Sequence, residues 1–86
     1  MIIDGQLDLH TFRPAEVKTL VADYIDACLE HQVYDLRIIH GKGMGVLKAT
    51  VQSILSRHPA VAEFHTADET AGGWGATLVT LHRPRG

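Results

Sequence analysis

The chain has 86 residues, of which 45% are hydrophobic and 21% charged, with a formal net charge of −2. This length fits one domain with a single modest core, and we expect residues 1–86 to form one domain whose core spans about residues 7–81. The charge balance excludes a strongly basic nucleic-acid-binding chain. Any phosphate contact therefore has to come from a local cluster of side chains or backbone groups.

Cysteine usage and hydropathy indicate the compartment. Cys28 is the single cysteine, so it forms no internal disulfide and no zinc site with other thiolates, which suits a reducing cytoplasm. No run of residues approaches the ~18 apolar positions that a membrane span needs. The first residues also lack a signal-peptide pattern. We expect a cytoplasmic protein that makes no membrane contact.

The first predicted element is a half-buried strand over Gln6–His10, because apolar and polar residues alternate strictly there. Alternation places Leu7 and Leu9 toward the core. Asp8 and His10 then share the opposite face, two residues apart. An aspartate so placed can orient an imidazole, or the two groups can act on one water molecule or metal ion. A merely solvated strand face is the alternative.

A helix and a second strand follow. Pro14 suits the first position of a helix that extends to His31, since apolar residues recur at helical spacing along it. Val33–His40 predicts a more apolar strand. A strand, a long helix and another strand form a crossover, so these two strands should be parallel. Cys28 lies in the apolar stripe of the helix and is expected in the core.

The second half predicts one helix and two strands. Apolar residues after the glycine-rich turn mark a helix that ends near His58-Pro59. Val61–Thr66 is polar enough for a sheet edge, whereas Ala76–Leu81 is apolar on both faces and should be central. The order β-α-β-α-β-β predicts an α+β two-layer sandwich. Its mixed four-stranded sheet should carry both helices on one face and leave the other face open.

The turn after the second strand contains Gly41, Gly43 and Gly45 together with Lys42. It matches neither a Walker A loop nor a dinucleotide fingerprint. Glycines allow positive φ and close approach of the backbone to a ligand, and a helix N-terminus favours phosphate. The alternative is a tight connection that needs glycines only for its geometry. Strand alternation places His40 with the core residues, and its orientation stays open.

The loop Gly72–Gly75 carries Trp74, which could stack on a nucleic-acid base, fold over a core edge or anchor a protein partner.

Three segments of the chain together resemble the Smr (small MutS-related) domain family. Leu7–His10 resembles its LDLH motif, His40–Leu47 its HGxGxGxL motif, and Gly72–Leu81 its closing GGxGxTxVxL pattern. Each motif alone is permissive. All three in order at compatible spacing are specific.

The resemblance implies a fold similar to the C-terminal domain of translation initiation factor three. It also implies binding of DNA or RNA, branched or structured forms included, with nicking or endonucleolytic cleavage in several members. The contexts that it implies are DNA repair, recombination control and ribosome-associated RNA cleavage. A ribosome or a repair protein is therefore an implied partner. A non-catalytic module that docks on nucleic acid or a ribosome is the alternative.

In this picture Asp8 and His10 match the positions implicated in cleavage. Metal-free cleavage and cleavage with a divalent cation, Mg²⁺ or Mn²⁺ held with the help of Asp8, both stay open. The predicted nucleic-acid and phosphate contacts come from the motif turn, from a basic rim made of Arg13, Lys42 and Lys48, and from the tryptophan loop. They are His40, Gly41, Lys42, Gly43, Gly45, Arg13, Lys48, Gly73 and Trp74.

Overall fold

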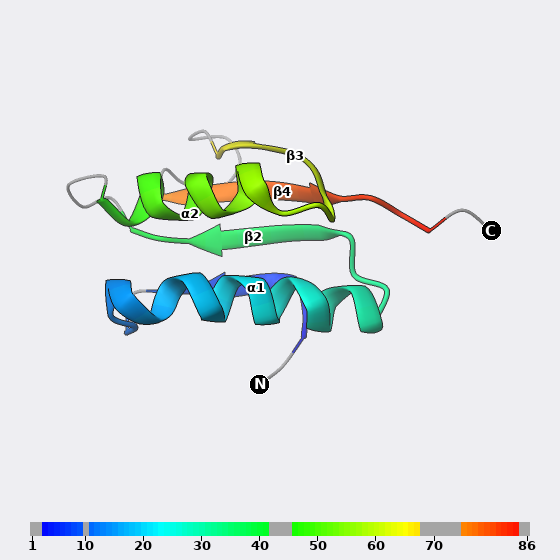
Figure 1. Cartoon of the computed structure of the whole chain (residues 1–86), viewed down its shortest axis with the longest axis horizontal. Coiled ribbons are helices and arrows are strands. Elements are labelled where there is room, and N and C mark those ends of the chain that lie inside the picture. The colour runs from blue at the N-terminus through cyan, green and yellow to red at the C-terminus, as the bar shows by residue number, and fades with distance from the viewer. Residues whose placement is uncertain (1–2, 10, 42–45, 68–74, 85–86) are drawn as a thin grey trace.

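The computed structural model of the chain describes residues 3–9, 11–41, 46–67 and 75–84. The elements follow the predicted order β-α-β-α-β-β (Figure 1). They are β1 (Gln6–Asp8), α1 (Pro14–Glu30), β2 (Asp35–Ile39), α2 (Val46–Arg57), β3 (Val61–Thr66) and β4 (Ala76–Leu81).

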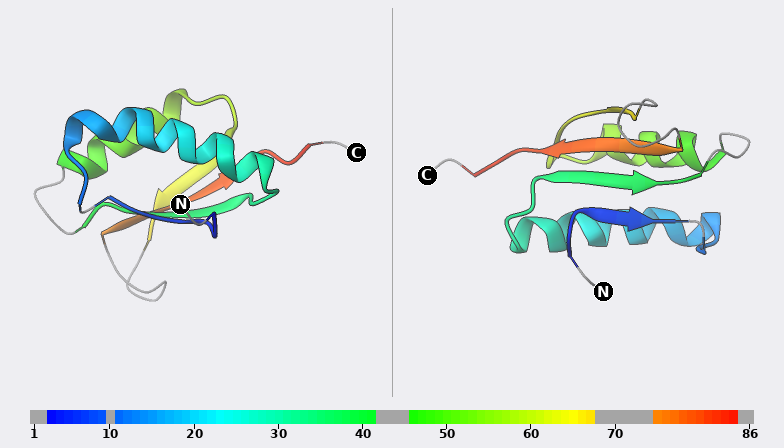
Figure 2. Two further views of the ribbon diagram at one scale, coloured as in Figure 1. Left: turned by 90° about the horizontal axis from the view of Figure 1, so that it is seen from below. Right: turned by 180° about the vertical axis from the view of Figure 1, so that it is seen from behind.

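The four strands form one mixed sheet in the order β1-β2-β4-β3. β1 pairs with β2 in parallel, and β4 pairs antiparallel with both β2 and β3. The parallel first pair, the central β4 and the edge position of β3 are all as predicted. Figure 2 shows both helices on one face of this sheet, so the α+β two-layer sandwich is confirmed.

Side chains alternate across the sheet in the way that the sequence pattern indicates. On β2, Leu36 and Ile38 are buried beneath the helices, whereas Arg37 and Ile39 lie half-buried on the other face. Because Ile38 is the partner of Thr77 in the antiparallel register, Thr77 also points to the helix-covered face. Cys28 is fully buried in the core, as predicted.

A glycine and a tyrosine fix the start of β1 against α1. The Tyr24 hydroxyl accepts the Gly5 N–H at 3.0 Å and donates to the Gln6 carbonyl at 3.0 Å. Gly5 has φ +88°, and a Cβ at this position would lie 2.8 Å from the backbone oxygen of Asp35. Only glycine avoids both the strained φ and the backbone clash. This contact fixes where β1 begins along β2.

The end of α1 explains why β2 is shorter than the predicted strand Val33–His40. The Val33 N–H bonds back to the Cys28 carbonyl at 2.8 Å, and the Gln32 N–H bonds to the Leu29 carbonyl at 3.2 Å. This pair of bonds is a Schellman motif, and Gln32 occupies its left-handed position with φ 60°. Since the Val33 N–H is used by the helix cap, the sheet ladder begins only at Asp35.

Candidate nucleic-acid interface

The described parts of the three motif segments meet at one end of the sheet. The Leu9 N–H donates to the Ile39 carbonyl at 2.8 Å, which joins the end of β1 to the end of β2. The Gly75 carbonyl accepts from both the His40 N–H at 2.8 Å and the Gly41 N–H at 2.9 Å. Segments far apart in sequence are therefore joined through backbone hydrogen bonds, and these bonds end the ladder of β2.

His40 points to the helix-covered face, which answers the question that strand alternation left open. Its side chain is 6% exposed. The Nδ1 atom lies 3.2 Å from the Gly41 carbonyl, and Nε2 lies 2.9 Å from the Thr77 hydroxyl. Because a carbonyl only accepts, Nδ1 carries the proton of this pair, and Nε2 accepts from the Thr77 hydroxyl. Both ring nitrogens are thus satisfied within the protein.

The surroundings of His40 favour its neutral form. Burial lowers the pKa of the imidazole below its ordinary value of 6.5, and the positive charge of Lys48 lowers it further. The hydrogen bond to the Gly41 carbonyl acts in the opposite direction and raises the pKa. A neutral imidazole between Gly41 and Thr77 is suited to holding the start of the turn in place. Its direct contact with nucleic acid stays a prediction.

Asp8 lies on the open face of the sheet, where alternation predicts it. It is the last residue of β1, it is exposed, and its register partner on β2 is Ile39. Asp8 and His40 therefore point to opposite faces at the same end of the sheet, and the candidate site extends around that end. His10 lies outside the described residues.

Gly41 begins the motif turn with φ +83°, and a Cβ built there would meet no atom of the described residues within 4 Å. The positive φ explains why glycine is favoured. The open space beside it would let a ligand approach the backbone closely. Five of the predicted contact residues lie outside the described part of the chain, and they are Lys42, Gly43, Gly45, Gly73 and Trp74.

The two described basic residues of the predicted rim lie near the starts of the two helices. Arg13 is exposed and caps α1, where its N–H donates to the Glu16 carboxylate at 3.1 Å. Lys48 is half-buried in the first turn of α2, close enough to His40 to influence its pKa. Both helices begin at the end of the sheet where the motif segments meet (Figure 1).

The described residues contain no group of three or more His, Cys, Asp or Glu side chains placed to hold a metal ion. Among the described residues, Asp8 is the carboxylate at the C-terminal end of β1. A single carboxylate does not by itself make a metal site.

Thr77 is a residue of this site that the sequence reasoning did not assign. It is fully buried and hydrogen-bonded to His40 from 37 positions away in sequence. The available signal was alternation along Ala76–Leu81, which places a polar threonine on the core face with Val79 and Leu81. A buried hydroxyl needs a partner.

Fold and site together define a small two-layer α+β domain with its sequence motifs gathered at one end of the sheet. The family model described as "Smr domain" matches residues 7–82. The chain therefore belongs to the Smr domain family.

No helix in the described part of the chain is long and apolar enough to cross a membrane.

Solved structures and named relatives agree with this family. The Smr domain of Thermus thermophilus MutS2 is 31% identical, with a TM-score of 0.84 over 91% of this chain and 98% of that one. YdaL, a stand-alone small MutS-related protein from Escherichia coli, is 27% identical, with a TM-score of 0.84 over 92% of this chain and 65% of its own. A relative from Shewanella baltica, named ribosome rescue factor SmrB, is 43% identical over 91% of this chain. This chain spans only 44% of that relative's length.

Proposed function

We propose that this Smr domain binds nucleic acid and hydrolyses phosphodiester bonds in DNA or structured RNA. The observation that carries the proposal is the meeting of the motif segments at one end of the sheet. That end presents the exposed carboxylate of Asp8 and the open space beside Gly41. Phosphodiester hydrolysis needs a general acid or base and groups that neutralise the charge developing on the phosphate.

The proposal gives each predicted residue a role. His10 is the general acid or base, and Asp8 orients it or helps to hold a divalent ion. The turn that begins at Gly41 holds the phosphate through the backbone N–H groups of residues 42–45 and the Lys42 ammonium, which neutralise the charge that develops on it, because the Gly41 N–H already donates to the Gly75 carbonyl. His40 and Thr77 act from beneath by holding the start of that turn.

Cleavage of supercoiled plasmid and of structured RNA tests the catalytic assignment. Asp8→Ala and His10→Ala should each lower the rate, by about 10²–10⁴-fold for loss of a general acid or base. Glu63→Ala is the matched control, because Glu63 is an exposed carboxylate on the edge strand β3. Parallel reactions with a chelator separate metal-dependent from metal-free cleavage. Rates that stay unchanged in both variants would refute the catalytic roles.

A binding experiment tests the turn separately from the chemistry. Lys42→Ala should weaken nucleic-acid binding and reduce the slope of log K against log salt by about 1. Binding and slope that match the unmodified protein across a salt series would contradict the role of Lys42 in holding phosphate.

A non-catalytic ribosome-docking module is the second candidate, and the names of the SmrB relatives favour it. In that case the Asp8→Ala and His10→Ala variants would still sediment with ribosomes, and the unmodified protein would cleave neither nucleic acid. Sedimentation and cleavage measured on the same preparations distinguish the two functions.

A further inference from the structure

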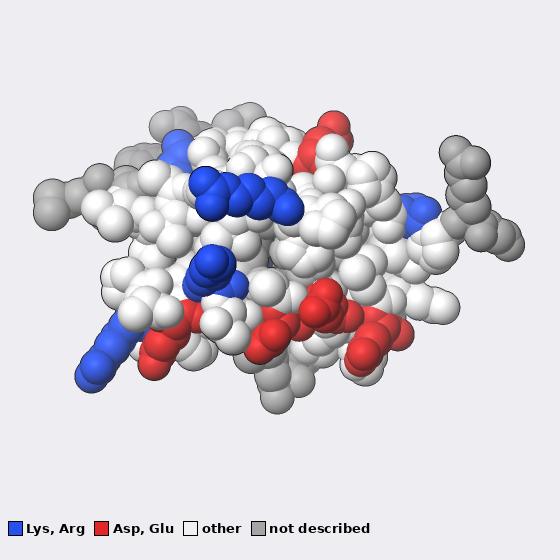
Figure 3. Space-filling view, viewed as in Figure 1, with Lys and Arg blue, Asp and Glu red and all other residues white. Residues whose placement is uncertain are grey.

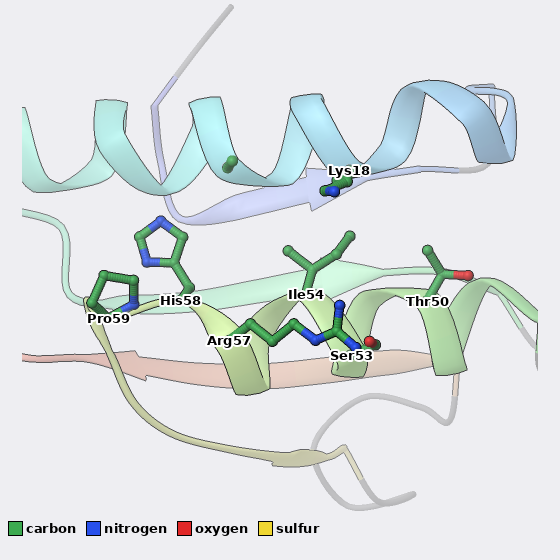
Figure 4. Close-up of a pocket in the computed structure, with 8 residues that line it drawn as sticks. Lys18, Thr50, Ser53, Ile54, Arg57, His58 and Pro59 are labelled. Atoms are coloured by element: carbon green, nitrogen blue, oxygen red, sulfur yellow. The ribbon is translucent and has the colours of Figure 1, made fainter.

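A groove of about 380 Å³ lies between α1 and α2 on the outer side of the helix layer (Figure 4). Its apolar lining comes from Ala22 on α1 and from Ile54 and Pro59 at α2 and just beyond it. Lys18 and Arg57 bring one positive charge from each side. A volume of this size, with apolar walls and a few polar groups, is typical of a ligand site.

The polar groups of the groove are mainly hydrogen-bond donors. Neither Lys18 nor Arg57 forms an ion pair with any described residue, and the Ser53 hydroxyl forms no hydrogen bond with one. The Ala60 N–H donates to Nδ1 of His58 at 3.1 Å, so neutral His58 carries its proton on Nε2. Donors that have no acceptor in the described structure suit an anion.

Charge is separated across the helix layer. In Figure 3, acidic side chains gather along the outer side of α1, whereas Lys and Arg side chains lie over α2 and between the two helices. The exposed acidic residues of α1 are Glu16, Asp23, Asp26 and Glu30. A chain with a net charge of −2 thus presents a local positive strip that would attract an anionic polymer.

The groove lies along the two helices, and both helices begin at the end of the molecule where the motif segments meet. Figure 4 shows Thr50 toward the N-terminal end of α2 and His58 toward its other end, with the Arg57 side chain reaching back alongside Ser53. Thr50 and Arg57 are about 10 Å apart along the helix axis at 1.5 Å per residue. A strand bound at the motif turn could therefore continue over the helix layer.

We propose that this groove binds the sugar–phosphate backbone of single-stranded nucleic acid that flanks the bond held at the motif end. Lys, Arg and Ser side chains are common phosphate contacts, and the apolar walls can pack against sugar or base. The inference rests on the proposed function and adds a second contact surface to it. Phosphate contacts in the groove give affinity without sequence preference.

Fluorescence anisotropy with two single-stranded oligonucleotides, of about 4 and about 16 nucleotides, tests the groove. Lys18→Gln combined with Arg57→Gln should lower the salt slope for the long oligonucleotide by about 1.4, or 0.7 for each lost phosphate contact. Binding of the short oligonucleotide should not change. Lys18→Arg combined with Arg57→Lys should keep the original slope.

Single variants control for net charge. Arg57→Gln and Arg83→Gln each remove one exposed guanidinium, but Arg83 lies beyond β4 against Asp35, 3.7 Å away. Only Arg57→Gln should reduce the slope for the long oligonucleotide. Equal slopes for the double variant and the unmodified protein would overturn the groove while leaving the proposed function intact. No binding of the long oligonucleotide by the unmodified protein would also overturn the groove, whereas the proposed function is tested by the plasmid and structured-RNA experiments above. A poly-glutamate peptide is the third probe, and binding of this peptide that the double variant loses, with oligonucleotide binding unchanged, would reassign the groove to an acidic protein partner.

Discussion

At the residue scale, the hydrogen bond between Thr77 and His40 is a buried polar interaction that supports the start of the motif turn from the helix-covered face of the sheet. Both side chains are buried, with exposures of 0% for Thr77 and 6% for His40. Their hydrogen bond leaves no side-chain donor or acceptor of either residue without a partner. Buried polar groups of this kind contribute little net free energy when paired but are costly when one partner is removed.

Thr77→Val should lower the free energy of unfolding by about 1–3 kcal/mol, because it leaves Nε2 of His40 buried without a donor. The measurement is chemical denaturation monitored by circular dichroism. Thr80→Val is the matched control, since Thr80 lies on the same strand but is half-buried on the open face. A loss as large for Thr80→Val as for Thr77→Val would contradict the importance of this hydrogen bond.

At the element scale, the C-terminal end of α1 carries a local strain that the fold tolerates. Gln32 occupies the left-handed position of the Schellman motif with φ 60°, where a Cβ is unfavourable and glycine is the usual residue. The motif sets where the chain leaves α1 and where β2 begins. The strain is thus retained at a position that connects the two layers of the sandwich.

Gln32→Gly should raise the free energy of unfolding by about 0.5–1 kcal/mol, because it removes the steric cost of positive φ. His31→Gly is the control, since His31 has φ −94° and gains nothing from glycine. That control should destabilise the protein or leave its stability unchanged. Thermal and denaturant unfolding of both variants make the comparison. A stabilisation of equal size in His31→Gly would refute the steric explanation.

At the scale of the whole molecule, the sequence predicted those features of the fold that depend on residue alternation and on the order of the elements along the chain. Alternation placed Asp8 on the open face, and two-sided apolarity placed β4 at the centre of the sheet. The contact of His40 with Thr77 could not be predicted, because it depends on the register between strands 37 residues apart. The groove between α1 and α2 likewise depends on how the helices pack, which neither helix encodes alone.

The pKa of His40 makes the stability of the whole molecule depend on pH. Its pKa is lowered in the folded state by burial, with Lys48 adding to the shift, from an ordinary value of 6.5. Between these two pKa values the unfolded chain binds more protons, so stability rises with pH. The contribution of neutral His40 is therefore fully present above about pH 6.5. It is lost as the pH falls toward and through the folded-state pKa.

We expect the free energy of unfolding to fall as the pH is lowered from 7 to 5, with His40 contributing at most about 1.4 kcal/mol per pH unit. His40→Gln removes the titrating group and should flatten this dependence, whatever its effect on stability at pH 7. His82→Gln is the control, because His82 is exposed at the end of β4, and it should keep the original dependence. Denaturant unfolding at closely spaced pH values gives the slopes. A His40→Gln slope equal to that of the unmodified protein would show that His40 does not couple folding to pH. A flatter slope would show that the buried imidazole at the motif end links protonation to the stability of the entire sandwich.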